Sequence, residues 1–254
     1  MDGYPLKRSR LLTAVFLIVT LVIGVLVAVA GANETECNIV SNLQNLARKT
    51  FGLQVFRIVT YLGDFYMWVI FTSIYSIYAY IKSRKHLDTA IELAIFLIIT
   101  TALTYSTKMV FARPRPSCSG ISAYDDDVIS SFSYPSGHVS RAAGAFAILS
   151  RGSRTKESLA IMAISLVSLS RIILGAHYLT DVVGGIFLSL AAQRLASLSF
   201  PLLKCKIKKR WLSGRHRHFN LSSNPTPRTF STLFAHAITK LNKPRSIIHW
   251  HEST

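Results

Sequence analysis

The feature that most constrains this chain is an uncharged, mostly apolar run near the N-terminus, from Leu11 to Ala30. As a helix this run would be about 30 Å long, which matches the hydrocarbon core of a bilayer. A signal peptide is the competing interpretation, but the run is longer than a usual signal core, and the letters AGANETEC at its end give a poor cleavage site. We therefore expect a retained membrane span.

Five more apolar segments follow. One of them (137–151) is short and another (87–107) contains Asp88 and Glu92, so each taken singly is also typical of a buried helix in a soluble protein. A row of six segments joined by short charged loops instead favours repeated crossing of a membrane. The sequence therefore predicts an all-α fold, a polytopic bundle of six transmembrane helices within residues 1–200. The expected spans are 11–30, 64–82, 87–107, 137–151, 157–175 and 178–200.

The basic residues agree with this topology and orient it. With the N-terminus in the cytoplasm, the other basic clusters also fall on the inner side, at 82–85, 151–156 and after Lys204. The outer loops then hold few basic residues, which is the positive-inside pattern. These outer loops are 32–54, 107–136 and 175–181. We expect a multi-pass protein of the cell membrane with both termini in the cytoplasm.

The net charge of +17 raises the question of a nucleic-acid partner. Most of the excess lies in the inner loops and in 204–245, beside the membrane, where anionic lipid head groups are the simpler partner. We therefore expect the basic cytoplasmic tail, 201–254, to contact anionic lipids, and we expect no nucleic acid. Within the tail, 229–241 places its apolar residues on one helical face. Such an amphipathic helix either lies in the membrane interface or packs against the inner ends of the bundle.

Cysteines and acidic residues give weaker indications. Cys37 and Cys118 both fall on the outer side, so the sequence is compatible with a disulfide and equally with two unpaired thiols. No cluster of Asp, Glu, His or Cys has the spacing of metal ligands, so we expect neither a metal nor another cofactor. The run from Asp125 to Asp127 is more typical of a solvated loop than of a cation site.

Three polar clusters near the outer surface carry the functional information, because polar residues at membrane depth are costly without a partner or a task. The first contains Lys108, Arg113 and Arg115, with Pro114 and Pro116, which force an extended path after the third span. Three cations so close together require an anion, and arginine can hold phosphate oxygens bidentately. Simple anchoring to lipid phosphates explains this cluster equally well when it is taken alone.

The second cluster is Pro135-Ser136-Gly137-His138, where the fourth span begins. The first N–H groups of a helix lack partners and its dipole is positive there. Ser136 can cap this end, and Gly137 lets a ligand approach the backbone. The result is a cradle for an anion, with His138 beside it to give or take a proton. The alternative is an ordinary helix cap with an interfacial histidine.

The third cluster is Ser170-Arg171 followed by His177 and Asp181, at the junction of the fifth and sixth spans. His177 and Asp181 are four residues apart, so they share a face if they are helical. A carboxylate that accepts a bond from one imidazole nitrogen leaves the other nitrogen free and nucleophilic. The alternative is a structural pair at a helix corner.

The predicted topology brings all three clusters to one membrane face. There the cations, a helix N-terminus and two histidines would together form a site for a phosphoryl group. In this order and spacing the clusters resemble the three motifs of the type 2 phosphatidic acid phosphatase superfamily. The motifs lie between Lys108 and Asp181, and the six-helix layout extends the resemblance to about 10–200.

The resemblance implies a metal-independent phosphatase with a phosphohistidine intermediate. His177 would be the nucleophile, and Asp181 its orienting partner. His138 would be the acid that protonates the leaving oxygen and then the base that activates water. Arg113 and Arg141 lie outside the motifs, and Arg113 could touch a second phosphate. The oxygens of the transition state would be held by Lys108, Arg115, Arg171, Ser136 and the backbone of Gly137.

A site at the outer face suits an amphiphile whose head group lies there and whose chains reach into lipid. The compact layout is similar to small prokaryotic polyprenyl diphosphate phosphatases, so the expected substrate is an undecaprenyl or dolichyl type of diphosphate. A phosphatidate or phosphatidylglycerol phosphate phosphatase is the next alternative. A rival from another class is a non-catalytic membrane protein that only binds phospholipid, or a channel-like bundle, which the intact His138, His177 and Asp181 disfavour.

Overall fold

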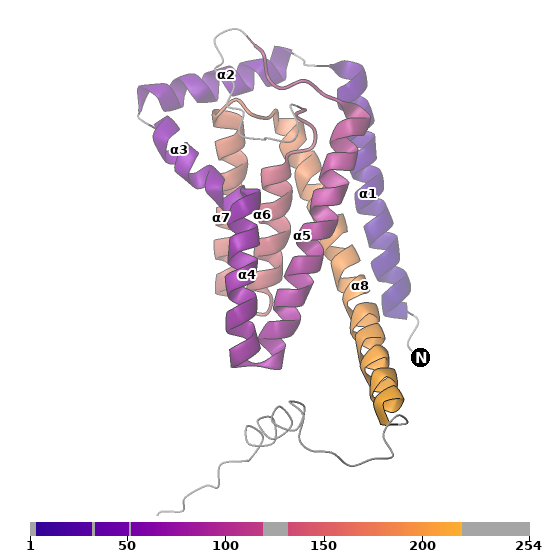
Figure 1. Cartoon of the computed structure of the whole chain (residues 1–254). Coiled ribbons are helices and arrows are strands. Elements are labelled where there is room, and N and C mark those ends of the chain that lie inside the picture. Colours follow the sequence, from indigo (N-terminus) through magenta and orange to yellow (C-terminus); the bar gives the residue numbers. More distant parts are fainter. Residues whose placement is uncertain (1–3, 32–33, 51, 119–131, 220–254) are drawn as a thin grey trace, which may run out of the picture. The chain divides into compact units, whose positions relative to one another are not determined.

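The structure, a computed structural model, describes residues 4–31, 34–50, 52–118 and 132–219. Within these ranges every regular element is helical (Figure 1), which confirms the predicted all-α fold. The elements are α1 (Tyr4–Ala30), α2 (Glu34–Lys49), α3 (Gly52–Thr60), the short turn η1 (Tyr61–Gly63), α4 (Phe65–Lys82), α5 (Arg84–Phe111), α6 (Gly137–Ser150), α7 (Arg154–Ile173) and α8 (Leu179–Phe219). Contacts divide the chain into two units, Met1–Lys204 and Cys205–Thr254.

Helix α6 is the buried centre of the first unit. Its residues from Gly137 to Ala145 are all buried, and it contacts both α5 and α7. A Cβ at Gly144 would lie 2.2 Å from the Phe96 ring of α5 and 2.7 Å from Ser189 Oγ of α8. Small residues at such positions let membrane helices approach closely. The apolar core around this helix consists of Trp68, Leu93, Phe96, Leu97, Ala145, Ile148, Ala192 and Ala196.

Three helical segments are long and apolar enough to cross a membrane: Ser9–Ala30, His86–Phe111 and Leu179–Pro201. A fourth candidate is the pair Gly52–Gly63 and Phe65–Lys82, whose helices are bent by 50° at the break between them. The described part of the chain thus has three candidate spans, or up to four, and six crossings stay a prediction. Helices α6 and α7 form where the fourth and fifth spans are expected, but α6 has only 14 residues. The first turn of α7 carries Arg154, Lys156 and Glu157.

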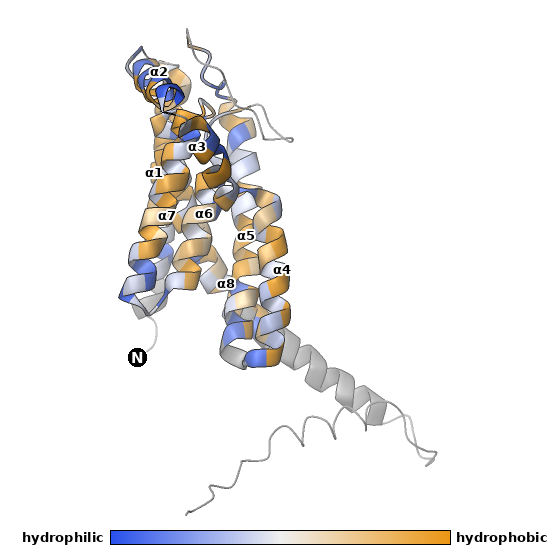
Figure 2. Cartoon of the chain, turned by 90° about the vertical axis from the view of Figure 1, so that its left-hand side faces the viewer, coloured by the Kyte–Doolittle hydropathy of each residue, from blue (hydrophilic) through white to orange (hydrophobic). Residues whose placement is uncertain are grey.

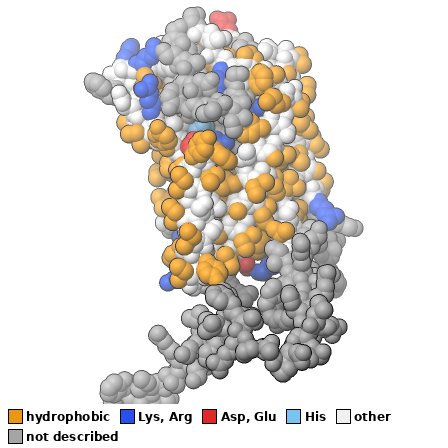
Figure 3. Space-filling view, viewed as in Figure 1, with side chains coloured by type: hydrophobic (Ala, Val, Ile, Leu, Met, Phe, Trp, Pro, Cys, Tyr) orange, Lys and Arg blue, Asp and Glu red, His pale blue; other side chains and the backbone are white. Residues whose placement is uncertain are grey.

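Apolar side chains on the outer surfaces of these helices are exposed, as expected where a bundle faces lipid. Val29 on α1 is 83% exposed and Ile81 on α4 is 80% exposed. Hydrophobic residues run along α1, α4 and α5 in Figure 2. On the face drawn in Figure 3 they cover the flank of the bundle, while Lys and Arg gather toward its ends. The chain is a membrane protein with several apolar helices.

The two acidic residues of the third predicted span are paired. Glu92 accepts from Arg151 Nη1 at 2.7 Å, and Asp88 accepts from Lys204 Nζ at 2.8 Å. Both carboxylates lie near the beginning of α5, and their cations come from segments distant in the sequence. These ion pairs account for the two charges in an otherwise apolar helix.

The segment 32–54 was expected to be an outer loop, but its described residues are largely helical. Helix α2 lies across one end of the bundle, and α3 runs from it toward α4 (Figure 1). The pattern of α2 has too few apolar residues to predict a membrane span, so a search for apolar runs misses it. Its buried residues recur every three or four positions and form the face turned toward the bundle. They are Glu36, Val40, Gln44 and Ala47.

Helix α8 continues through Pro201 to Phe219, so the end of the apolar pattern at Phe200-Pro201 is not the end of the helix. Proline removes one backbone donor and can kink a helix without ending it. The predicted amphipathic helix at 229–241 and the acidic run Asp125–Asp127 lie outside the described residues.

Candidate active site

The three polar clusters meet where α5 ends and where α6 and α8 begin. The Ser136 N–H donates to the Asp181 carbonyl at 3.0 Å, and Arg115 Nη1 donates to the Ala176 carbonyl at 3.5 Å. Gly185 of α8 lies so close to Ser136 that a Cβ on Gly185 would be 2.8 Å from the Ser136 carbonyl oxygen. The second and third clusters are therefore in direct contact, and the first reaches the third through Arg115.

The first cluster begins in the last turn of α5. The helix ends at Ala112, whose φ of 43° is left-handed. Lys108 is fully buried, and its Nζ donates to the Phe132 carbonyl. The Arg113 carbonyl accepts from the Ser133 N–H at 2.8 Å. These bonds hold the extended chain after α5 against the segment that leads into α6.

The second cluster begins α6 where it is predicted to, with Gly137 as the first helical residue and Ser136 at the N-cap position. Contrary to expectation, the Ser136 side chain does not cap the helix. Its Oγ is buried and has no hydrogen-bond partner among the described residues. A buried hydroxyl in that state costs on the order of 1–3 kcal/mol. Its position beside the unpaired N–H groups of a helix start fits the binding of an anion.

His138 lies in the first turn of α6 and is 4% exposed. Its Nδ1 is 3.5 Å from Arg141 Nη2, and Arg141 Nε donates to the Gly63 carbonyl at 3.0 Å. A Cβ at Gly63 would lie 2.8 Å from both the Cβ and the carbonyl oxygen of His138. The turn η1 therefore forms one side of the site.

Arg171, in the last turn of α7, is fully buried and contacts Thr60, the last residue of α3 before η1. Its Nη1 donates to Thr60 Oγ1 at 2.8 Å. Its carbonyl oxygen accepts from the N–H groups of Ala176 and His177 at 3.1 and 3.3 Å. The chain turns at Gly175, where a φ of 68° favours glycine. These bonds fix the position of the Arg171 guanidinium and the path of the chain into α8.

His177 precedes α8, and Asp181 lies in its first turn. Asp181 Oδ2 is 3.7 Å from His177 Nδ1 and accepts from the Tyr178 N–H at 2.8 Å. Its Oδ1 accepts from Arg113 Nη1 at 2.7 Å. The separation of 3.7 Å is longer than a hydrogen bond. The carboxylate therefore faces one nitrogen of the imidazole, as the spacing predicts.

Comparison with known proteins agrees with this geometry. The sequence model of the PAP2 superfamily matches residues 89–204, which include all three clusters. Over this range the chain resembles the PAP2 superfamily. The first transmembrane PAP2 type phosphatidylglycerolphosphate phosphatase from Bacillus subtilis has a similar structure. The two are 24% identical, with a TM-score of 0.60 over 73% of this chain and 94% of that one. LpxE from Aquifex aeolicus is 24% identical, with a TM-score of 0.49 over 63% of this chain and 91% of that one.

The PAP2 motifs do not include every residue that contacts this site. Thr60 and Gly63 come from a segment without a recognisable motif, and their contacts with Arg171 and Arg141 appear only in the fold. The expectation that Arg113 could touch a second phosphate is wrong, because its guanidinium donates to Asp181 and, at 2.6 Å, to Glu36.

A disulfide joins Cys37 to Cys118, which decides between the two alternatives that the sequence leaves open. It brings the start of α2, and with it Glu36, next to the PAP2 motifs. The prediction that both cysteines lie on the outer side is the one sequence signal that could have led to Glu36. Among the residues that the structure describes, no group of three or more His, Cys, Asp or Glu side chains is arranged to hold a metal ion.

Proposed function

We propose that the chain is an integral-membrane lipid phosphatase that hydrolyses a phosphate monoester or diphosphate of a lipid through a phosphohistidine on His177. The observation that carries this proposal is the contact between the start of α6 and the start of α8, the Ser136 N–H to Asp181 carbonyl bond of 3.0 Å. That bond connects the backbone two residues before His138 to the backbone of Asp181, the partner of His177. Two imidazoles beside buried cations are suited to phosphoryl transfer.

In the first step, Nε2 of His177 attacks the terminal phosphorus, and a P–N bond forms as the P–O bond to the leaving group breaks. The leaving group is the lipid alcohol for a monoester and the lipid monophosphate for a diphosphate. Asp181, facing Nδ1, stabilises the positive charge that develops on the ring. His138 donates a proton to the departing oxygen of that leaving group. In the second step, His138 takes a proton from water, and the hydroxide attacks phosphorus. The P–N bond then breaks, which releases phosphate and restores His177.

The oxygens of the phosphoryl group would be held by fixed positive groups throughout. Lys108 and Arg171 are fully buried, and Arg115 donates to the carbonyl of Ala176, the residue before His177. The hydroxyl of Ser136 and the backbone N–H of Gly137 would complete this cradle at the helix start. Guanidinium and ammonium groups supply here the charge that a metal ion supplies in other phosphatases, so we expect the reaction to be independent of metal.

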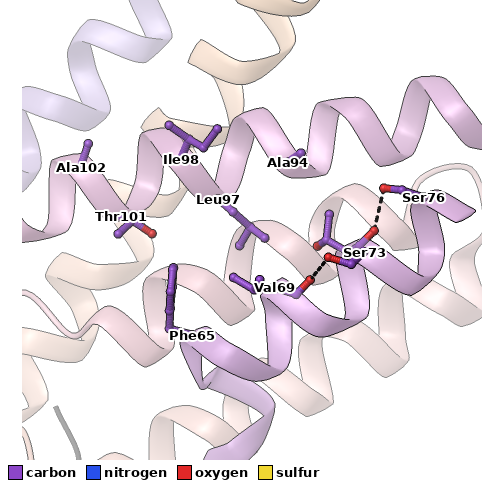
Figure 4. A pocket seen from close by; sticks show the side chains of 10 residues that line it. Phe65, Val69, Ser73, Ser76, Ala94, Leu97, Ile98, Thr101 and Ala102 are labelled. Atoms are coloured by element: carbon purple, nitrogen blue, oxygen red, sulfur yellow. Dashed lines mark hydrogen bonds between the residues drawn. The ribbon is translucent and has the colours of Figure 1, made fainter. Parts of the chain in front are cut away.

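An apolar groove between α4 and α5 supports a lipid as the substrate. It has a volume of about 580 Å³, and Phe65 lies at one end of it while Ser76 and Ala94 lie toward the other (Figure 4). The Phe65 ring is 5.9 Å from the guanidinium of Arg141, which contacts His138. One end of the groove is therefore close to the proposed reaction centre, and the groove follows the flank of the bundle, where lipid chains lie.

We infer that the substrate is a polyprenyl diphosphate of the undecaprenyl or dolichyl kind, because the groove between α4 and α5 fits a single lipid chain better than two. Phosphatidate and phosphatidylglycerol phosphate, which carry two acyl chains, are the alternatives. The Bacillus subtilis protein of similar structure is a phosphatase of the second of these lipids. A protein that binds phospholipid without cleaving it is the rival from another class.

The proposed topology places the site on the outer face of the cell membrane and both termini in the cytoplasm. The basic tail, 201–254, would then face the anionic inner leaflet, and no nucleic-acid partner is expected. Labelling of single cysteines with an impermeant thiol reagent in intact cells, in a variant without Cys37, Cys118 and Cys205, tests this arrangement. A cysteine at position 34 should react, whereas one at position 152 should not.

Phosphate release by the purified full chain in detergent tests the activity. The three lipids are compared for wild type and His177→Ala, each with and without a chelator. We expect turnover of the polyprenyl diphosphate that the chelator leaves unchanged and that His177→Ala abolishes. Turnover that survives in His177→Ala would contradict the mechanism, and binding without turnover of any of the three lipids would favour the non-catalytic rival.

A further inference from the structure

A buried ion network lies behind Asp181, on the side away from His177. Arg113 donates through Nη1 to Asp181 Oδ1 at 2.7 Å and through Nη2 to Glu36 Oε2 at 2.6 Å. Arg113 is 2% exposed and Asp181 is fully buried. Burial lowers the pKa of the Arg113 guanidinium, but the two carboxylates raise that pKa by more, so it lies above its ordinary value. The guanidinium is therefore a permanent positive charge between two carboxylates.

Thr180 closes this network into a ring. Its Oγ1 accepts from Arg113 Nη1 at 2.7 Å and donates to Glu36 Oε1 at 2.6 Å, and its N–H donates to the same Oε1 at 3.2 Å. The guanidinium also lies 4.2 Å from the centre of the Tyr178 ring. Glu36 and Arg113 thus contact three residues in the short segment that follows His177.

The disulfide links the two sides of this network covalently. Cys37 directly follows Glu36 in the first turn of α2, and Cys118 belongs to the same extended segment as Arg113. Helix α2 presents a mixed polar and apolar face to the bundle, so apolar burial alone holds it weakly. The covalent link keeps the Glu36 carboxylate within reach of Arg113.

We propose that Glu36 and Arg113 are positioning residues for the His177–Asp181 pair, held in register by the Cys37–Cys118 disulfide. Because Arg113 occupies Oδ1 of Asp181, Oδ2 stays directed at His177 Nδ1. The guanidinium also stabilises the ionised form of a carboxylate that burial would otherwise disfavour. Glu36 holds the other half of the guanidinium and so fixes its plane. This inference rests on the proposed function, in which Asp181 orients the nucleophile.

Kinetics of Glu36→Gln give the first test, because the amide keeps the size and the acceptor oxygen of Glu36 and removes its charge. A misplacement of about 1 Å can cost on the order of 100-fold in rate, so we expect kcat to fall by about 10- to 100-fold. The KM should stay within about twofold, because no lipid or phosphate contact is altered. Glu34→Gln, in the same helical turn but exposed, is the matched control and should keep the wild-type kcat. A wild-type kcat in Glu36→Gln would overturn the proposal.

The role of the disulfide is tested separately. The double variant Cys37→Ser/Cys118→Ser should lose kcat to a similar degree, and dithiothreitol should lower the wild type toward the same value. Cys205→Ser is the control for the substitution itself and should match the wild type. If reduction and the double variant both leave kcat unchanged, the disulfide has no part in positioning, and that part of the proposal is wrong.

A loss of folded protein would also lower the rate, so a second readout is needed. The tautomer of His177 can be read from ¹⁵N NMR of the full chain labelled at histidine, without substrate, with the signal assigned by its loss in His177→Gln. We expect the proton on Nδ1 in the wild type and a mixture of tautomers in Glu36→Gln. The same His177 signal in both proteins would overturn the inference whatever the rates. A wild type without turnover would overturn the proposed function instead, and the NMR comparison would still decide the inference.

Discussion

Replacing Gly63 by alanine should displace His138 without removing any group that binds phosphate. A Cβ at this position would lie 2.8 Å from the carbonyl oxygen of His138 and 3.0 Å from its carbonyl carbon. Both are backbone atoms of the first turn of α6, so no side-chain rotation can relieve the contact. Because optimal contacts between carbon atoms are about 3.5–4.0 Å, η1 and α6 must separate by roughly 0.5 Å or more.

The expected magnitudes follow from this displacement. Overpacking of a close contact costs about 1–3 kcal/mol, which would lower the melting temperature by roughly 3–10 °C in a chain of this size. Since a misplacement of about 1 Å can cost on the order of 100-fold in rate, a shift of about half that size should lower kcat by about 10-fold. The Arg141 bond to the Gly63 carbonyl would be strained by the same movement.

The assay is phosphate release at a temperature well below the melting transition, measured together with thermal denaturation in detergent. Gly52→Ala in α3 is the matched control, because the atom nearest to its Cβ would be a side-chain oxygen, Thr50 Oγ1, at 3.3 Å. It should keep both the wild-type kcat and the wild-type melting temperature. If Gly63→Ala behaves like Gly52→Ala, then η1 does not hold His138, and the description of this side of the site is wrong.

Three further substitutions have separable outcomes. Ser136→Ala should lower kcat by about 100-fold, as loss of a transition-state donor does, yet leave the melting temperature unchanged or higher, because a buried unpaired hydroxyl is removed. Asp181→Asn should lower kcat by about 10⁴-fold with little change in KM. Gly144→Val should lower the melting temperature by several degrees, because the Phe96 ring of α5 occupies its Cβ position. Each is checked by phosphate release and thermal denaturation, and a wild-type result in either of the first two would contradict the proposed roles.

Apolar runs and motif spacing predicted much of the fold and the clusters of the site. The helices α1, α4, α5, α6, α7 and α8 form where apolar segments were expected, since burial and lipid both select long apolar runs. The start of α6 at Gly137 follows from the local sequence, and so does the position of His177 opposite Asp181, four residues later. Such short spacings can be read directly from a sequence. The number of crossings does not follow in the same way, because a short helix such as α6 can be buried by its neighbours instead of spanning lipid.

The contacts that the sequence did not predict are long-range and polar. Glu36 reaches Arg113 across 77 positions, and Thr60 reaches Arg171 across 111. Neither pair has a local spacing rule, and α2, which carries Glu36, lacks the apolar content that marks a span. The expected cap by Ser136 is wrong for a different reason. A serine at the N-cap position can donate to a ligand instead of accepting from its own helix, and the sequence alone does not distinguish the two.

The most direct test of the account is a search for the covalent intermediate. Wild type and His138→Ala are mixed with lipid substrate labelled with ³²P at the scissile phosphate and quenched in alkali, where phosphohistidine survives. The label is then located by peptide mass spectrometry. The account predicts phosphate on His177 in both proteins. In His138→Ala the label should form more slowly and be lost more slowly, because the acid of the first step and the base of the second are both missing. Label on another residue, or steady turnover by a wild type that never carries label on His177, would contradict it.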